Sequence, residues 1–267
     1  MSDEIAKAYP NSKQAWSLIG VFILTLILFV PIYLFADKIA GKELSTLIYY
    51  LLTMGSLFWI AHIKRKTYTN ASEYNFEFSS PAIIALTSIT TIAIQIGLIY
   101  PIVSSLPMPE FVKKIFLELS ERQGLFSFLA IVIAAPILEE LVFRGIILDG
   151  FLKKYSPVKS ILLSSIIFGV FHLNPWQFIT ALITGIFSGW VYYKTKKITT
   201  SILIHFTNNL LAFVFMYFMD PKRMLDQTIT TFYGGVLNTL AITLGAILVG
   251  AICLYYLREI FQTERAL

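Results

Sequence analysis

A long apolar stretch of this chain carries three charged side chains at a depth where hydrocarbon is expected. Glu139, Glu140 and Arg144 directly follow the apolar run from Leu125 to Leu138, and the pattern predicts one membrane helix for the whole segment. A single acidic or basic side chain at the centre of such a helix costs roughly 2.5–3.5 kcal/mol. Three of them within six residues therefore indicate buried chemistry.

Two later apolar stretches hold polar side chains at helical spacing. Phe168 precedes His172 by four residues, and His205 precedes Asn209 by four, so each pair shares one face of a helix. An imidazole can orient a water molecule or share its proton. His205 and Asn209 can hydrogen-bond a carbonyl oxygen that gains negative charge. For both pairs, the alternative is a hydrogen bond that holds two membrane helices together.

The two glutamates are expected to have different roles. Glu140 and Arg144 are one helical turn apart, so they can pair and stay ionised at a reduced desolvation cost. Glu139 is turned by about 100° on the helix and cannot share that geometry fully. It is therefore the carboxylate that can take a proton from water. The alternative is a structural triad in which both glutamates bind Arg144.

These side chains must be positioned by helices that cross a bilayer. About 30 Å of hydrocarbon requires roughly 20 apolar residues, and apolar stretches near this length recur along the chain. We expect an all-α polytopic membrane protein with about eight transmembrane helices in one bundle, forming a single integral membrane domain over 1–267 with a catalytic core at 125–219. The expected helices are 16–36, 45–63, 82–103, 125–151, 159–173, 177–193, 199–219 and 235–257.

Prolines predict where the fifth of these helices ends and where the fourth is kinked. The residue before a proline avoids the helical conformation, so Asn174-Pro175 is expected to end this helix and begin a tight reversal. In the fourth helix, Pro136 removes a backbone donor and permits a kink just before the glutamates.

Composition supports a membrane protein and excludes several other classes. The chain is 57% hydrophobic and 14% charged, outside the range of ordinary soluble domains. The net charge of +5 is spread over short loops, and no basic run exceeds Lys64-Arg65-Lys66, so a nucleic-acid partner is not expected. The single cysteine, Cys253, cannot form an intramolecular disulfide and is expected to be a packing residue.

Loop charges predict how the chain lies in the membrane. The run 16–36 is too long for a signal-peptide core and is expected to be an uncleaved first span. Basic residues are more numerous in the loops on the N-terminal side of the membrane, which places that side in the cytoplasm. We therefore expect a multi-pass protein of the cell membrane with both termini cytoplasmic.

The three polar motifs, taken in order, resemble the CPBP family. This family contains CAAX prenyl endopeptidases of the second type and bacteriocin-processing or immunity (Abi) proteins. Its pattern is E-E-x-x-x-R, then F-x-x-x-H, then H-x-x-x-N. The motif residues of this chain are Glu139, Glu140, Arg144, Phe168, His172, His205 and Asn209. The resemblance is strong over 125–219, and the remaining helices match only in general character.

The resemblance implies an intramembrane glutamic endopeptidase with a CAAX-protease/Abi-like core that opens toward the cytoplasm. It implies that Glu139 activates the water with help from His172, and that His205 and Asn209 form the oxyanion hole. The implied substrate is a membrane-embedded or lipidated protein or peptide, with prenylated substrates as the family precedent. The supporting residues are Glu140, Arg144 and Phe168.

Alternatives remain for the cofactor and for the function. The family has often been labelled metalloprotease, and Glu139, His172 and His205 are an acceptable zinc set. We expect catalysis without a metal, because Asn209 is better explained by oxyanion binding. A non-enzymatic membrane regulator or bacteriocin-immunity protein of the same family is the alternative function, and the intact motifs favour the enzyme. A transporter is disfavoured because no inverted repeat is apparent.

Overall fold

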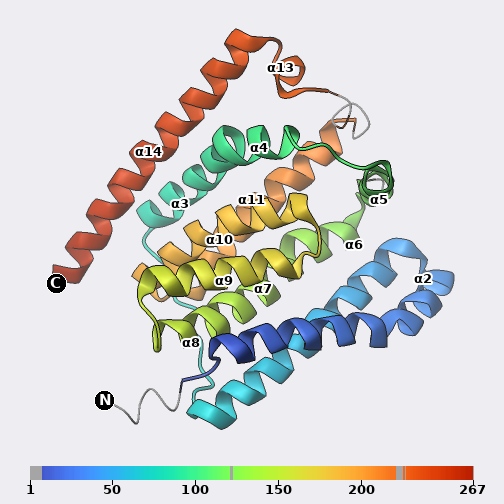
Figure 1. Cartoon of the computed structure of the whole chain (residues 1–267), viewed down its shortest axis with the longest axis vertical. Coiled ribbons are helices and arrows are strands. Elements are labelled where there is room, and N and C mark those ends of the chain that lie inside the picture. Colours follow the sequence, from blue (N-terminus) through green and yellow to red (C-terminus); the bar gives the residue numbers. More distant parts are fainter. Residues whose placement is uncertain (1–7, 121–122, 221–224, 226, 267) are drawn as a thin grey trace. The chain divides into compact units, whose positions relative to one another are not determined.

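The computed structural model describes residues 8–120, 123–220, 225 and 227–266. Throughout this part of the chain the regular elements are helices and no strand occurs, which confirms the all-α class (Figure 1). The chain divides into two compact units, each made of two stretches of sequence. Unit 1 is Met1–Phe78 with Gly124–Ile202, and unit 2 is Ser79–Gln123 with Leu203–Leu267. The prediction of a single domain over 1–267 stays a prediction.

The predicted spans fall on helices, but their number is not confirmed as eight. Within the described residues, five helices are long and apolar enough to cross a membrane. One of them, α2 (Ser12–Thr69), contains both 16–36 and 45–63, because two helices meet at Gly41, whose φ of 78° suits glycine. The helix α9 (Pro157–Phe171) is shorter than a full span. The helix α10 (Pro175–Thr195) is not one of the five.

The start and the two arms of α2 are held by specific hydrogen bonds. Asn11 caps the helix: its side chain accepts from the backbone N–H of Gln14 (2.9 Å), and the Gln14 side chain accepts from the backbone N–H of Asn11 (2.8 Å). The Tyr49 hydroxyl in the second arm donates to the backbone oxygen of Leu26 in the first arm (2.7 Å). This bond joins the helix before Gly41 to the helix after it, and it gives a partner to a hydroxyl that would be costly to leave unpaired in a bilayer.

The helix that carries the paired glutamates is continuous and contains two π-helical segments, in which the turns are wider than in an α-helix. Its successive segments are α6 (Leu125–Phe128), η2 (Leu129–Ala134), α7 (Ala135–Glu140), η3 (Leu141–Leu148) and α8 (Asp149–Leu152). Pro136 follows η2 and has no N–H to donate, which explains why the ladder widens just before it. Wide turns of this kind occur often at functional sites, and here they flank Glu139 and Glu140.

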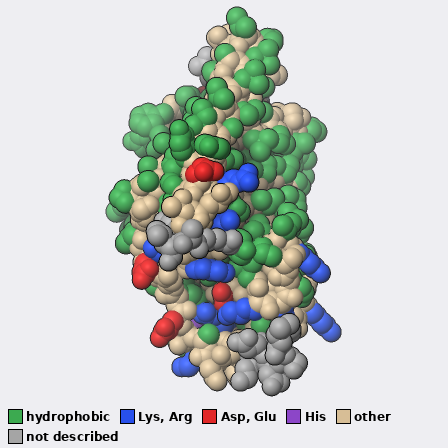
Figure 2. All heavy atoms as spheres, turned by 90° about the vertical axis from the view of Figure 1, so that its left-hand side faces the viewer, with side chains coloured by type: hydrophobic (Ala, Val, Ile, Leu, Met, Phe, Trp, Pro, Cys, Tyr) green, Lys and Arg blue, Asp and Glu red, His purple; other side chains and the backbone are tan. Residues whose placement is uncertain are grey.

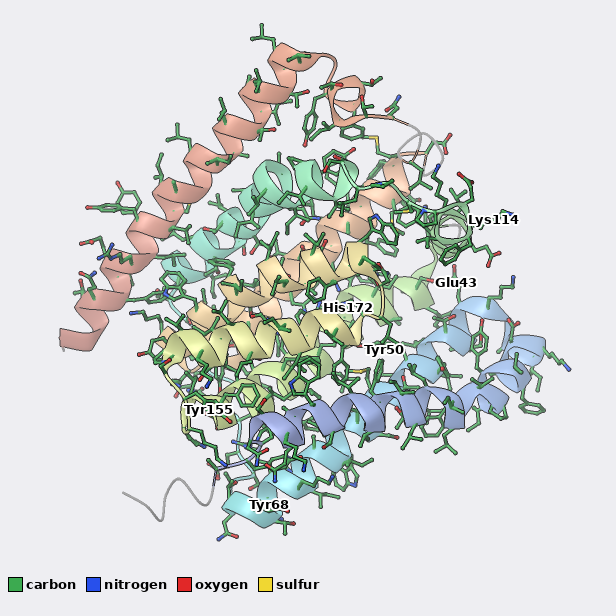
Figure 3. The ribbon with its side chains drawn as sticks, in the orientation of Figure 1. Glu43, Tyr50, Tyr68, Lys114, Tyr155 and His172 are labelled. Carbon is green, nitrogen blue, oxygen red and sulfur yellow. The ribbon has the colours of Figure 1, made fainter. Side chains whose placement is uncertain are left out.

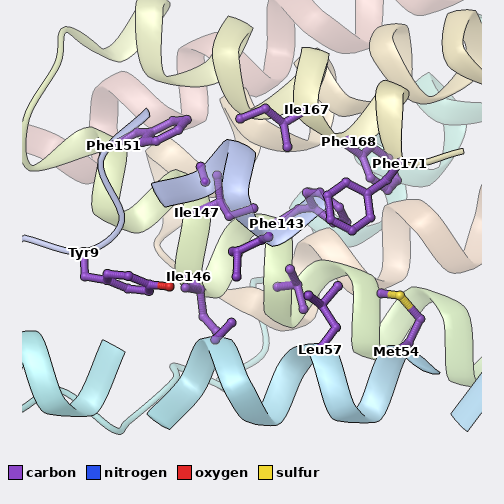
Figure 4. Close-up of a cluster of buried hydrophobic side chains, with 14 of the residues drawn as sticks. Tyr9, Met54, Leu57, Phe143, Ile146, Ile147, Phe151, Ile167, Phe168 and Phe171 are labelled. Carbon is purple, nitrogen blue, oxygen red and sulfur yellow. The ribbon is translucent and has the colours of Figure 1, made fainter. Parts of the chain in front are cut away.

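Unit 1 has an apolar core between α2, η3 and α9 (Figure 4). Phe143 lies at its centre, with its ring 4.7 Å from that of Phe168 and 4.9 Å from that of Phe171. Leu57 on α2 and Ile146 on η3 are completely buried. A buried side chain of this size stabilises the fold by roughly 1.5–3 kcal/mol, so this core holds the glutamate-bearing helix in place.

The reversal predicted at Asn174-Pro175 is confirmed. His172 ends α9, and Leu173 adopts a left-handed conformation with φ of 54°. The Asn174 side chain then caps α10 by accepting from the backbone N–H of Gln177 (3.0 Å), and Pro175 is the first helical residue. The helices α9 and α10 pack against each other along their length (Figure 1).

Unit 2 is built on the packing of a C-terminal helix against the third predicted span. Its elements are α3 (Pro81–Ile94), η1 (Gln95–Ile99), α4 (Tyr100–Ser104), α5 (Glu110–Ser120), residues 203–218 of α11 (Ile198–Phe218), α13 (Ile229–Phe232) and α14 (Val236–Ala266). A Cβ on Gly97 would lie 3.1 Å from the Ala246 side chain, so this glycine permits the close approach of η1 to α14. Cys253 is buried in α14, as expected of a packing residue.

Candidate active site

Glu140 and Arg144 form a buried ion pair in unit 1. Arg144 Nη1 lies 3.0 Å from Glu140 Oε1, and each residue is 1% exposed. Two further polar atoms of the pair are bound from α10: the Ser188 hydroxyl donates to Glu140 Oε2 (3.3 Å), and Arg144 Nη2 donates to the backbone oxygen of Gly185 (3.3 Å). A buried pair is tolerated only with such additional hydrogen bonds, so these contacts fit a supporting role.

The sequence did not identify the two partners on α10. Gly185 contributes a backbone oxygen, and a Cβ at this position would lie 3.1 Å from the Ser165 side chain, so glycine allows α10 to approach α9. Ser188 has the small hydroxyl side chain that is common between membrane helices. A serine three residues after a glycine on one helix is a signal of close helix packing, but it does not indicate which charge the serine binds.

Phe168 connects the ion pair to His172. The Arg144 guanidinium carbon lies 4.7 Å from the centre of the Phe168 ring, a favourable cation–π contact. The same ring meets His172 edge to face, with centroids 5.1 Å apart and planes at 79°. The predicted packing of Phe168 beside the imidazole is therefore observed, and it restricts the orientation of His172.

A hydrogen bond assigns the proton on the His172 ring. Nδ1 lies 2.9 Å from the backbone oxygen of Phe168. Because a carbonyl oxygen can only accept, Nδ1 must carry the hydrogen, and the neutral ring then has its lone pair on Nε2. His172 is half-buried at the end of α9, so Nε2 is the nitrogen suited to accept a hydrogen bond from water.

Glu139 is adjacent to the ion pair in sequence but differs from Glu140 in environment. It is half-buried whereas Glu140 is buried. The Tyr50 hydroxyl donates a hydrogen bond of 2.8 Å to Glu139 Oε1, from a helix 89 residues earlier in the chain. Tyr50 lies on α2 and His172 at the end of α9 (Figure 3). Tyr50 positions the Glu139 carboxylate. In the sequence it is one of two adjacent tyrosines in the apolar range 45–63, and nothing there distinguishes it from Tyr49.

His205 and Asn209 lie one turn apart on α11, in the part of this helix that belongs to unit 2. Both are half-buried. The Asn208 side chain, which is 8% exposed, donates from Nδ2 to Asn209 Oδ1 (3.1 Å) and so orients the Asn209 amide. Contacts in unit 1 thus join Glu140, Arg144, Phe168 and His172 in one series, and Glu139 is bound by Tyr50 in the same unit. His205 and Asn209 belong to unit 2.

The donor chemistry of a zinc site is present in the sequence, as a carboxylate and two imidazoles. In the described part of the chain, no group of three histidine, cysteine, aspartate or glutamate side chains lies together in a way that could hold a metal ion. Catalysis without a metal stays a prediction.

Comparisons with known proteins agree with the motifs. Residues 121–211 match the family model described as "Type II CAAX prenyl endopeptidase Rce1-like", and this range contains all seven motif residues. The chain is also similar to "Putative membrane peptidase YdiL" of Bacillus subtilis (strain 168), with 33% identity over 99 residues. That match covers 37% of this chain and 40% of the relative. No solved structure matches the chain.

Proposed function

We propose that this membrane protein of the CPBP family is an intramembrane glutamic endopeptidase that hydrolyses a peptide bond with water activated by Glu139. The observation that carries the proposal is the division between the two glutamates. Glu140 is buried in an ion pair with Arg144, whereas Glu139 is half-buried and bound by the Tyr50 hydroxyl. The similarity to membrane peptidases supports the same reaction class.

The first step is the activation of water. Glu139 accepts a proton from a water molecule, and Nε2 of His172 accepts a hydrogen bond from the second O–H of that water and so orients it. The oxygen of the activated water adds to the carbonyl carbon of the scissile peptide. General-base assistance of this kind contributes typically about 10²–10⁴-fold in rate.

The second step is the collapse of the tetrahedral intermediate. His205 and Asn209 donate hydrogen bonds to the oxygen that has gained negative charge, and this assignment rests on the H-x-x-x-N motif. One such donor is worth about 2.7–4 kcal/mol of transition-state stabilisation. The C–N bond then breaks, and the proton held by Glu139 passes to the leaving amine, which restores the carboxylate.

The substrate class follows from the setting of the residues. Glu139 lies in a helix long and apolar enough to cross a bilayer, so a substrate must reach it within the membrane or at its surface. A membrane-embedded or lipidated protein or peptide meets this requirement, and prenylated proteins are the precedent in the family. We place the protein in the cell membrane with both termini in the cytoplasm, as the loop charges indicate.

The proposal is tested with three strains of cells, which produce the native protein, the Glu139→Gln variant or the Glu118→Gln variant. The peptides present in the membranes of the three strains are compared. Glu118 lies exposed on α5, outside the motifs, and serves as the matched control. Cleavage products are expected with the native protein and the control, and uncleaved substrate with Glu139→Gln. If the membranes of all three strains contain the same peptides, the proposal that the protein is an endopeptidase is contradicted. A cellular phenotype that survives Glu139→Gln would support the non-enzymatic regulator instead.

A further inference from the structure

Unit 1 contains a polar cavity that the proposed reaction does not use. Its volume is about 190 Å³. Its lining comes from the end of α2, the segment 70–78, the junction of η3 with α8, and the junction of α10 with α11. None of the seven motif residues lines it, although Gly145 in its wall directly follows Arg144.

The floor of the cavity is formed around a buried guanidinium. Arg65 is 7% exposed, and its Nη1 donates to the backbone oxygen of Glu73 (3.1 Å). Its guanidinium carbon lies 4.7 Å from the centre of the Tyr74 ring. The nearest carboxylate oxygen, Asp149 Oδ2, is 3.8 Å from Nη2 and is bound more closely by Lys153 at 2.8 Å. Arg65 is therefore fixed in position, and its charge is only partly compensated.

Two opposite charges lie at the mouth of the cavity. Lys196 and Glu73 both line it and are both exposed. The Lys196 ammonium lies 5.7 Å from the centre of the Tyr192 ring and 5.6 Å from that of Tyr193, which holds it over the aromatic surface. Within the described residues, neither charge has an ion-pair partner at 4.0 Å or less. The mouth thus offers one cation and one anion that are more than 4.0 Å apart.

The surroundings of the cavity resemble the polar edge of a membrane protein. Tyrosine, lysine and arginine concentrate at the ends of membrane helices, where the lipid headgroups lie. Tyr74, Tyr192 and Lys196 lie at or just beyond the ends of α2 and α10, with Arg65 in the last turns of α2. On the face drawn in Figure 2, hydrophobic side chains cover much of the surface, and the charged side chains lie in the middle and lower part of the view.

We propose that this cavity binds a phosphate ester that carries a primary ammonium group a short linker away. The phosphate binds Lys196 at the mouth with Arg65 beneath it, and the ammonium binds the Glu73 carboxylate. Charged hydrogen bonds of this kind are the strongest available to such a ligand. Phosphatidylethanolamine in the bilayer and glycerophosphoethanolamine in solution share this chemistry.

The charge balance of the lining selects this ligand over related ones. The lining contains two cations, Arg65 and Lys196, and two carboxylates, Glu73 and Asp149, so the charges of its side chains sum to zero. A purely anionic headgroup meets repulsion from the carboxylates that offsets its attraction to the cations. A trimethylammonium group has no N–H to donate to Glu73. A zwitterion with a primary amine satisfies both ends.

The test uses the full-length protein in a neutral detergent, with binding measured by native mass spectrometry. The probes are short-chain phosphatidylethanolamine, phosphatidylglycerol and phosphatidylcholine, together with soluble glycerophosphoethanolamine. Phosphatidylethanolamine is expected to bind about tenfold more tightly than the other two lipids, as one charged hydrogen bond implies. If the soluble probe binds as tightly as the lipid, the headgroup alone provides the affinity; if it binds more weakly, the ligand is the membrane lipid.

Variants assign the binding to the cavity. Lys196→Gln and Glu73→Gln are each expected to weaken phosphatidylethanolamine binding by about tenfold. Lys194→Gln is the matched control, because Lys194 lies on the same helix end and does not line the cavity; it should bind like the native protein. Thermal unfolding without lipid confirms that each variant is folded. Equal binding of all three lipids, or equal losses with Lys194→Gln and Lys196→Gln, would overturn the proposal.

Discussion

Replacing Glu140 by glutamine removes one half of the buried ion pair and leaves Arg144 charged at 1% exposure. The substitution keeps the size of the side chain, so the expected effect is electrostatic. The backbone oxygen of Gly185 that accepts from Arg144 cannot neutralise the guanidinium, because a carbonyl group has no net charge. The protein with Glu140→Gln is therefore expected to be folded less stably than the native protein.

The size of the effect follows from the burial of the pair. Removing one partner of a buried ion pair typically costs about 3–5 kcal/mol, since the other charge is left uncompensated. For a protein of this length, roughly 2–4 °C of Tm correspond to each kcal/mol, so Tm should fall by about 6–20 °C. Arg144→Met removes the other partner of the pair and should also destabilise the protein.

The assay is thermal unfolding of the purified protein in detergent, followed by tryptophan fluorescence. The double variant Glu140→Gln/Arg144→Met contains no buried charge at this place. It is expected to be more stable than Glu140→Gln alone, by about 2 kcal/mol or more. Glu139→Gln is the control, because it removes the carboxylate at the neighbouring position. Glu139 is half-buried and lies outside the ion pair, so this substitution should change the free energy of unfolding by about 1 kcal/mol or less.

Two results would refute this reasoning. One is a Glu140→Gln protein as stable as the Glu139→Gln protein, which would mean that the pair does not hold the helix. The other is a double variant whose loss equals the sum of the two single losses, which would mean that Glu140 and Arg144 act independently.

Three further outcomes are expected. Tyr50→Phe removes the hydrogen bond to Glu139 and should lower kcat about tenfold with Tm unchanged; an unchanged kcat would exclude a positioning role. Asn209→Ala should lower kcat by about 10²–10³-fold, and the neighbouring Asn208→Ala by much less; the reverse order would contradict the proposed oxyanion donor. The native enzyme should keep its activity after treatment with a chelator, whereas activity that is lost and then restored by zinc would require a metal.

Local spacing was sufficient to predict part of the site. The Glu140–Arg144 pair and the contact of Phe168 with His172 each join residues four apart on one helix, where the helical repeat alone sets the geometry. The end of α9 at Asn174-Pro175 was predictable for a similar reason, because proline restricts the residue before it.

Contacts between helices could not be predicted from the sequence. Tyr50 reaches Glu139 from a helix 89 residues away, and the register in which two membrane helices pack is not encoded in the hydropathy of either. The wide turns of η3 were also missed: Pro136 indicated a kink, but no proline lies in the range 141–148. The predicted number of eight spans is not confirmed for a physical reason. The helix α9 is shorter than a lone span requires, and α10 is long enough but not apolar enough.

The central claim is that Glu139, and not Glu140, activates the water that cleaves the peptide bond. The most direct test is the cleavage rate of a substrate found in the peptide comparison, measured with purified native protein and with Glu139→Gln. Glu139→Gln is expected to lower kcat by about 10²–10⁴-fold, with a Tm within about 3 °C of the native value. A folded Glu139→Gln protein that cleaves at the native rate would contradict it.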